Sequence, residues 1–368
     1  MAKRLCALNK WLGVVLALAI AVAGSGCAAD KGAAASSETV GEDDVFNTDD
    51  LLVAEASGSG AAKVGDPATL LKVARDAVDK SKSHVKKVAD LIKTIAAGKK
   101  PTATGTTVVG KLPYGKWTGS EAGVDLTLWV IRTAENRLRY VLYGKKGADP
   151  AKALLTGIFI KKAPRVGGGR LHVSLTNTTA LFGAPGKTGS MHVWFANHKS
   201  DAKGRRVAYL NVKDAADPQA LPANYAADAI YRPGAGGRLR QIYVADLDPK
   251  QQGLELFAMR VLWKIGTGGR ADAVYANVTA QKTTKLADAH ECWGADGNRT
   301  AYSSTPDDPN NAKEGDTSNC FTFAQETVPD KVATTSGQDP DPELDQMLAD
   351  AGAAGIAEAD ADKTDGAQ

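Results

Sequence analysis

Six arginines recur at the same kind of position along the middle of the chain. Each follows a Gly or Asn that ends a turn and precedes a run of β-forming residues: Arg137, Arg170, Arg205, Arg238, Arg270 and Arg299. If each one begins the return strand of a hairpin, the guanidinium groups line one rim of a sheet. Such a rim would bind the phosphate or carboxylate groups of an anionic glycan or lipid. The alternative is that these arginines are solvated and only protect strand edges from pairing.

The histidines offer a second possible site. His192, Trp194 and His198 share strand parity and so lie on one face, and His172 can stand across a hairpin from His192. Two or three imidazoles there would serve zinc binding or acid–base chemistry. Because no Asp, Glu or Cys is placed to complete such a site, structural or exposed histidines are the favoured interpretation, and no metal is expected.

Residues 183–188 read GAPGKT and partly match a phosphate-binding loop. That motif needs Gly where Leu181 stands, and it needs a helix afterwards, whereas residues 190–197 alternate like a strand. A Pro-Gly hairpin turn explains the stretch better. No serine-nucleophile elbow, metal-binding helix motif or carboxylate pair is evident either. We therefore expect no enzyme activity, no cofactor and no nucleic-acid partner.

The N-terminus predicts export. Lys3, Arg4 and Lys10 precede an apolar run over residues 11–24, which is shorter than the roughly 20 residues of a membrane-spanning helix. Small residues at 23–26 then lead to Cys27. The stretch resembles bacterial lipoprotein signals, although Gly24 stands where those signals usually have Leu. The resemblance implies lipidation of Cys27. The residue after Cys27 is Ala28 rather than Asp, which resembles lipoproteins that are sorted to the outer membrane. Ordinary secretion is the alternative.

The other cysteines agree with an oxidising compartment. Cys6 would be removed with the signal peptide, which leaves Cys292 and Cys320 as an even pair. A disulfide between them would close a loop and stabilise the fold by roughly 3–4 kcal/mol. A metal site that combines the pair with His290 is the weaker alternative, because no Cys-x-x-Cys spacing is present.

Charge and composition divide the chain into five parts: a signal peptide (1–26), an acidic tether (27–65), an amphipathic helix (66–98), a β domain with a disulfide-closed cap (106–325) and an acidic disordered tail (326–368). Residues 67–325 carry a formal charge of +16, whereas 27–66 carry −7 and 326–368 carry −9. The basic body can favour an anionic surface or polymer, or the charges of body and tails can simply balance for solubility.

Helical periodicity is clear only near the start of the body. Asp66 followed by Pro67 predicts a helix start, and Gly98 predicts its end. One apolar stripe runs along this segment: Leu71, Ala74, Val78, Val85, Val88, Ile92 and Ile95. We expect the stripe to pack on its own domain, with a coiled-coil seam or partner surface as the alternative.

From about residue 106 the apolar period changes to two. The sequence predicts strands at 123–133, 136–144, 153–162, 170–182, 189–197, 205–213, 226–232, 238–246, 253–265, 270–279 and 285–293. The connections are short and show no helical pattern, so neighbouring strands pair antiparallel. The prediction is a mainly β protein, an antiparallel meander that forms an open barrel or a sandwich.

Residues 268–304 resemble uncharacterised lipoproteins of myxobacteria. The similarity rests on a Gly-Arg-x-Asp strand, a Glu-Cys-Trp stretch, a Tyr-containing strand and a later cysteine: Arg270, Asp272, Glu291, Cys292, Trp293, Tyr302 and Cys320. The resemblance covers about 55 residues in a chain of 368. It implies a Gram-negative envelope lipoprotein and implies no activity.

The sequence therefore predicts a non-enzymatic lipoprotein of binding or structural type. It would be lipid-anchored in the outer membrane, on the periplasmic face or the cell surface, with an anionic glycan or lipid as a possible partner. Its outline is also similar to half-barrel lipoprotein carriers, in which a helix covers antiparallel strands. A carrier of lipid or another apolar ligand is thus the alternative, and an envelope hydrolase is the third.

Overall fold

The computed structural model describes residues 68–76, 92, 94–96, 99–107, 111–163, 166–183, 186–198, 202–217, 219–248, 253–279, 282–307, 313–317 and 320. The predicted signal peptide, Cys27, the tether and the acidic tail lie outside the described residues. No helix in the described part of the chain combines the length and the hydropathy of a membrane span.

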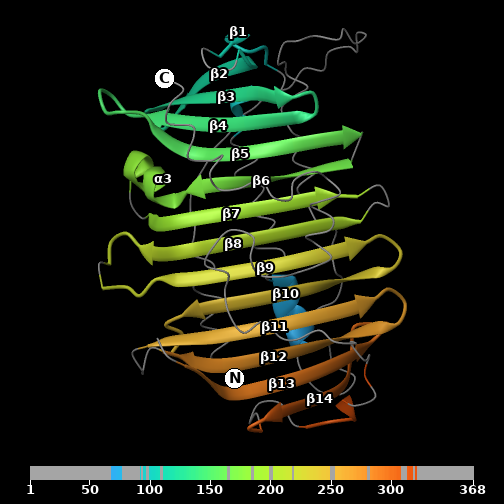
Figure 1. The fold of residues 1–368 in the computed structure, drawn as a ribbon. Helices are drawn as coiled ribbons and strands as arrows, with labels where there is room; N and C mark the ends of the chain where they lie inside the picture. The colour runs from blue at the N-terminus through green and yellow to red at the C-terminus, as the bar shows by residue number, and fades with distance from the viewer. Residues whose placement is uncertain are drawn as a thin grey trace.

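Fourteen antiparallel strands form a single sheet whose spatial order is the order of the chain (Figure 1). They are β1 (Ala103–Thr106), β2 (Pro113–Glu121), β3 (Val124–Ala134), β4 (Arg137–Lys145), β5 (Lys152–Ala163), β6 (Val166–Ser174), β7 (Lys187–Asn197), β8 (Lys203–Asp214), β9 (Ala223–Arg232), β10 (Gly236–Ala245), β11 (Leu254–Lys264), β12 (Gly268–Val278), β13 (Thr283–Gly294) and β14 (Arg299–Thr305). The sheet is open, with β1 and β14 at its two edges. The predicted mainly β meander is confirmed, and the described strands make one open sheet rather than the two sheets of a sandwich.

Local turn chemistry explains why the chain folds back so often. The turn between β2 and β3 consists of Ala122 and Gly123, both with positive φ (47° and 75°), as a two-residue hairpin turn requires. Gly236 and Gly268 open β10 and β12 with φ of 136° and 123°. A Cβ at Gly236 would lie 2.1 Å from the carbonyl oxygen of Trp263, and one at Gly268 would lie 2.1 Å from that of Trp293. Only glycine therefore fits at these strand starts.

The predicted strand 170–182 is wrong in its second half. β6 ends at Ser174, and residues Leu175–Phe182 form the helix α3. The Ser174 hydroxyl accepts a hydrogen bond from the backbone N–H of Asn177 at 3.1 Å, which caps the helix. Thr178 donates its hydroxyl to the carbonyl of Ser174. Alternating apolar residues predicted a strand here, but the cap made by Ser174 starts a helix instead. The strands β1 and β2 were not predicted, whereas β14 begins at Arg299, where a return strand was expected.

The two faces of the sheet bury different sets of side chains. On one face, which we call the helix-side face, Leu239, Tyr243 and Met259 pack in one cluster with Leu71 and Ile92. On the opposite face, a smaller cluster contains Trp194, Ala208, Ile230, Ile242 and Ala258. We call this second face the arginine face, for reasons given below.

Within the predicted helix 66–98 the structure describes residues 68–76, 92 and 94–96, and all of these except Ala68 are helical. Within these residues the apolar stripe lies in the core: Leu71, Ala74, Ile92 and Ile95 are at most 5% exposed. They belong to the same cluster as the strands. The described part of the stripe thus packs on its own domain, as predicted. Asp66 and residues 78–88 lie outside the described residues.

A buried carboxylate holds the first helical turn against the end of the sheet. Glu291 in β13 accepts hydrogen bonds from the backbone N–H groups of Thr69 and Leu70, at 2.9 and 2.5 Å. Arg299 in β14 donates to the same carboxylate, with Nε at 2.7 Å from Oε1. Both side chains of this ion pair are 0% exposed. A charge so deeply buried is stable because the helix N-terminus and the guanidinium together satisfy it.

The other end of the same segment contacts the opposite end of the sheet. Trp117 in β2 donates its indole N–H to the carbonyl of Lys99 at 2.9 Å. Ile95 lies beside Gly119, also in β2. Thr69 and Leu70 therefore contact β13, whereas Ile95 and Lys99 contact β2, near the opposite end of the sheet.

The predicted disulfide is present. Cys292 in β13 and Cys320 are bonded, with Cα atoms 5.9 Å apart and a sequence separation of 28. Residues of the closed loop return to the sheet, since Tyr302 in β14 and Glu314 exchange two backbone hydrogen bonds. The disulfide thus secures a short segment against the last strand.

We expect Glu291→Gln to lower the free energy of unfolding by about 3 kcal/mol, because Arg299 would keep its charge in a buried site without a counter-charge. Urea denaturation followed by far-UV circular dichroism measures the change. Glu135→Gln, in the exposed turn between β3 and β4, serves as the matched control and should shift stability by no more than about 0.5 kcal/mol. Equal effects of the two substitutions would contradict the assignment.

Candidate anion-binding face

The six arginines predicted from the sequence all lie near the starts of return strands. They occupy β4, β6, β8, β10, β12 and β14, which all run in one direction and start at one rim of the sheet. The strand positions therefore match the expectation. The side chains, however, do not all point the same way. Residues paired across strands share a face, and by this register Arg137, Arg170, Arg238 and Arg270 lie on the arginine face.

Arg205 and Arg299 lie on the helix-side face, which corrects the prediction of a single line of six. Arg205 is opposite Ala229 and Phe195, both in the helix-side cluster. It is 5% exposed and donates to the carbonyl of Ala196 and the amide oxygen of Asn197, at 2.9 and 2.7 Å. Both arginines thus make buried contacts within the protein and do not line the rim of the sheet.

The arginine face gathers further arginines that the prediction missed. A line of mutually paired residues crosses the sheet from β4 to β13, and we call it the central row: Arg139, Ile158, Arg170, Trp194, Arg206, Asp228, Arg240, Arg260, Asp272 and His290. Arg137, Arg238 and Arg270 lie on the same face, two residues earlier in β4, β10 and β12. The two lines together hold eight arginines and two aspartates.

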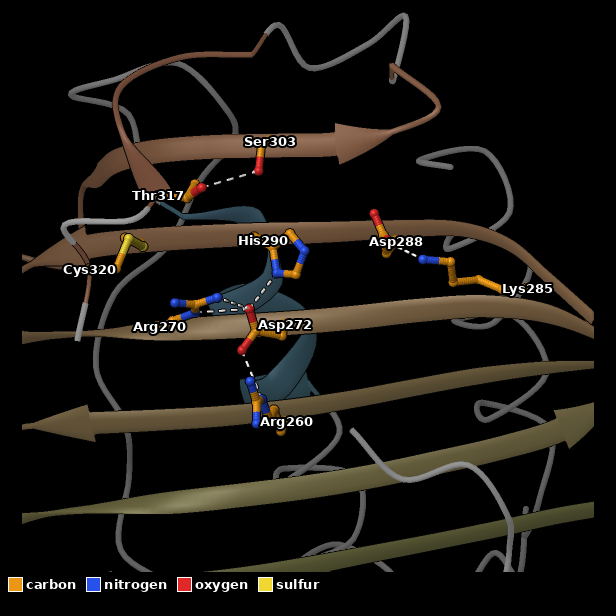
Figure 2. Close-up of polar contacts among 10 residues, drawn as sticks. Arg260, Arg270, Asp272, Lys285, Asp288, His290, Ser303, Thr317 and Cys320 are labelled. Atoms are coloured by element: carbon orange, nitrogen blue, oxygen red, sulfur yellow. Dashed lines mark hydrogen bonds and ion pairs between the residues drawn. A yellow bond between two sulfur atoms is a disulfide. The ribbon is translucent and has the colours of Figure 1, made fainter. Parts of the chain in front are cut away.

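Asp272 contacts three side chains of the arginine face (Figure 2). Its side chain is 1% exposed. Arg260 Nε donates to Oδ2 at 2.8 Å, and Arg270 donates to Oδ1 by Nε at 2.9 Å. His290 Nδ1 lies 2.5 Å from the same Oδ1. Three side chains from three neighbouring strands, β11, β12 and β13, are therefore oriented by one carboxylate.

These partners decide the charge of Asp272. Burial raises the pKa of the carboxyl, but the hydrogen bonds from His290 and Arg270, the positive charge of Arg270 and the hydrogen bond from Arg260 outweigh burial. The pKa consequently falls from 3.8 to about 2. Asp272 is an anion at every physiological pH and holds the two guanidinium groups in place.

A second buried pair lies further along the row. Arg206 donates through Nε to Asp228 at 2.5 Å, and both side chains are at most 6% exposed. The Arg206 guanidinium also lies over the Trp194 ring, 5.8 Å from its centre. A single arginine is thus fixed by a carboxylate on one side and an aromatic ring on the other.

The predicted pairing of His172 with His192 is correct, since the two residues are opposite each other in β6 and β7. Their rings are stacked with centres 4.6 Å apart, and His192 stacks in turn on Trp194. Ser190 Oγ lies 3.0 Å from His192 Nε2. Among the described residues no three His, Cys, Asp or Glu side chains gather as metal ligands would.

The stretch 183–188 lies between α3 and β7, and Ala184 and Pro185, on which the predicted Pro-Gly turn depends, lie outside the described residues. Gly183 ends the helix, and Lys187 already belongs to β7. Lys187 pairs with Asp214, with Nζ 3.0 Å from Oδ2. The lysine that would contact phosphate in a nucleotide-binding loop thus lies in a strand and is paired to a carboxylate.

The missed arginines had a signal in the sequence. Arg139 and Arg240 follow the predicted Arg137 and Arg238 at a spacing of two, which places both members of each pair on one face of a strand. Arg206 gave no such signal, because it is adjacent to Arg205 and one of the two had to point to the other face. Asp228 and Asp272 could be placed only once the strands were paired.

Comparisons with family models, curated proteins and solved structures find no match to this chain. The arginine face is therefore interpreted from its own chemistry.

We expect the Asp272 carboxylate to stabilise the fold above pH 4 and to lose this contribution as the pH falls through about 2, because its folded pKa is below the ordinary value of 3.8. The contribution is about 2 kcal/mol. The difference in unfolding free energy between wild type and Asp272→Asn should therefore narrow by that amount between pH 5 and pH 2 in urea titrations.

Asp288→Asn is the control for this measurement, because Asp288 pairs with Lys285, whose side chain is 60% exposed. A pair so exposed contributes little. If the difference in unfolding free energy between wild type and Asp272→Asn stayed constant with pH, the proposed role of the carboxylate would be contradicted.

Proposed function

We propose that this protein is a non-enzymatic lipoprotein of the bacterial cell envelope that binds an anionic ligand on its arginine face. The observation that carries the proposal is the excess of arginine on two adjacent lines of one sheet face, where eight arginines accompany two aspartates. An excess of one charge on one face attracts ligands of the opposite charge.

The chemistry of these arginines suits carboxylate and phosphate groups. The guanidinium is planar and donates two parallel hydrogen bonds to such groups, and it stays charged at any physiological pH. Arg139, Arg170, Arg238 and Arg240 are half-buried in strands rather than extended from loops. Charge-assisted hydrogen bonds are stronger in such partly desolvated sites than in bulk water.

Asp272 supports binding by orienting its neighbours. It fixes Arg260 and Arg270, whose side chains are 16% and 18% exposed, whereas Arg206 is buried together with Asp228. Binding costs less when the groups that contact the ligand are already ordered. Because Asp272 is buried, it acts on both arginines from within the sheet.

The envelope location is supported by the sequence and by the disulfide. A cleaved signal followed by a lipidated Cys27 would attach the protein to the outer membrane, on the periplasmic face or the cell surface. The Cys292–Cys320 bond fits an oxidising compartment. Anionic glycans and lipid headgroups are abundant at such a membrane, and either presents the groups that arginine binds.

The alternative function, a carrier of an apolar ligand, would use the helix-side face. There, register aligns five aromatic rings on successive strands: Tyr209, Tyr225, Tyr243, Phe257 and Tyr275. Burial raises the pKa of Tyr209 and Tyr243, so both phenols stay neutral. The rings belong to the cluster that contains the helical residues. The excess of arginine makes the arginine face the better-supported binding surface.

We expect the combined substitution of Arg139, Arg170, Arg238 and Arg240 by Gln to abolish retention on a column of immobilised anionic glycan at low salt. The reason is that four of the eight guanidinium groups of the face are lost while Asp228 and Asp272 keep their partners. Elution along a sodium chloride gradient is the measurement, because screening weakens the remaining contacts.

The matched control replaces Lys100, Lys111, Lys146 and Lys282 by Gln. These four lysines are exposed and lie outside the strands, so the change in net charge is the same. Thermal melting of both variants shows whether they are folded. Should the lysine variant lose as much retention as the arginine variant, attraction would be due to net charge and the proposal would be wrong.

A further inference from the structure

The arginine face carries more positive charge than its own aspartates balance. Its two lines hold eight arginines with Asp228 and Asp272, which leaves six positive charges in excess. Like charges gathered on one face repel each other, and anionic groups near that face reduce the repulsion. The chain contains two acidic segments that can supply such groups, residues 27–66 with a formal charge of −7 and residues 326–368 with −9.

The Cys292–Cys320 disulfide determines where the C-terminal acidic segment is attached. Cys292 is opposite Arg270 in the register of β12 and β13, so its side chain lies on the arginine face. Figure 2 shows Cys320 on the same side of the sheet as Arg270 and His290. The first acidic residue of the segment, Glu326, follows Cys320 by six positions, which span at most about 22 Å. The C-terminal acidic segment is therefore attached to the sheet on its arginine face.

The N-terminal acidic segment is attached to the other face. Residues 27–66 precede Ala68, which belongs to the helix-side cluster. The next two residues donate their backbone N–H groups to Glu291, whose register partner Ala271 is in the same cluster. Of the two acidic segments, the C-terminal one is thus the one that the fold brings to the arginine face.

We propose that residues 326–368 bind the arginine face of the same chain and compete there with the anionic ligand. The inference rests on the proposed function, because the segment and the ligand share one surface. The segment has 11 acidic residues against only Lys331 and Lys363, and carboxylates are groups to which a guanidinium donates paired hydrogen bonds. The arginine face is then regulated by its own chain, since an anionic ligand binds only when it displaces the acidic segment.

Arg270 is the contact nearest to the point of attachment. Asp272 accepts from Nε and Nη2 of Arg270 at 2.9 and 2.8 Å, and Nη1 has no partner among the described residues. The Arg270 side chain is 18% exposed, and its neighbour across the strands is Cys292. Elsewhere on the face the attraction does not require each guanidinium to be open, because the summed field of the arginines acts over a Debye length of about 8–10 Å.

The segment is long enough to reach the whole face. From β13 to β4 there are nine strand spacings, about 43 Å. Asp339 follows Cys320 by 19 residues, which span up to about 65 Å when extended. A contact within one chain forms at an effective concentration on the order of millimolar, so weak charge pairs are sufficient to keep the segment on the face.

The test neutralises a run of acidic residues in the full chain. Four carboxylates lie at alternate positions between 339 and 345, and the C-terminal variant replaces all four: Asp339→Asn, Asp341→Asn, Glu343→Gln and Asp345→Asn. On a column of immobilised polygalacturonate this variant should elute at about twice the sodium chloride concentration of wild type, because fewer carboxylates of the chain compete with those of the column.

The matched control is an N-terminal variant with the same types of substitution and the same change in net charge: Glu42→Gln, Asp43→Asn, Asp44→Asn and Asp49→Asn. Because residues 27–66 are attached to the helix-side face, its elution should differ from that of wild type by no more than about a tenth. Thermal melting establishes that both variants are folded before their elution is compared.

A peptide measures occupancy of the face directly. In titration calorimetry, a synthetic peptide of residues 326–345 should bind the C-terminal variant at least about fivefold more tightly than wild type, since the intact segment of wild type competes with it. Adding Arg270→Gln to the C-terminal variant should weaken peptide binding about threefold, because one charge-assisted contact is lost. Asp272 keeps Arg260 and His290 as partners in that protein. Adding Lys100→Gln, which removes an exposed charge outside the strands, should leave the affinity unchanged.

The outcomes separate this inference from the proposed function. Equal elution of the C-terminal and N-terminal variants, or equal peptide affinity for the C-terminal variant and wild type, would overturn competition by the segment and leave anion binding in place. Retention of the C-terminal variant with none of wild type would support both. If neither wild type nor either variant is retained and the peptide does not bind, the proposed function itself is wrong.

Discussion

The buried carboxylate of Glu291 is the interaction on which much of the described structure depends. It accepts hydrogen bonds from the first turn of the N-terminal helix and from Arg299, more than two hundred residues away from that turn in sequence. Sequential hairpins need only local contacts, but an open sheet must still cover one face. Glu291 attaches Thr69 and Leu70 to β13, and Trp117 attaches Lys99 to β2. The described residues on either side of 77–91 are thus held near opposite ends of the open sheet.

The meander also explains why the arginines on the arginine face are regularly spaced. In a sheet whose spatial order is the chain order, every second strand runs in the same direction and begins at the same rim. A hairpin motif repeated in sequence then recurs at equal intervals in space. Arg139, Arg170, Arg206 and Arg240 occupy equivalent sites for this reason. A fold with crossover connections would have scattered the same residues.

Much of the fold could be predicted because its signals are local. Period-two alternation located most of the central strands, the turn glycines placed the rim, and the even pair of cysteines predicted the disulfide. The errors have physical causes as well. β2 contains Pro113, Gly115 and Gly119, which obscure alternation, and α3 depends on a cap made by Ser174. The length of the N-terminal helix stays a prediction, because residues 77–91 lie outside the described residues.

The sequence by itself determined the alternation of strands and turns, the positive charge of residues 67–325 and the positions of arginine after turns. Each of these depends on neighbouring residues alone. Only the tertiary structure decided which arginines act together. Arg205 and Arg206 are adjacent, and nothing local distinguishes them, yet one lies among buried backbone acceptors and the other in the central row. Successive residues of a strand point to opposite faces, so a shift of one residue in register would exchange them. That register is set by pairing with strands distant in sequence, which no local pattern contains.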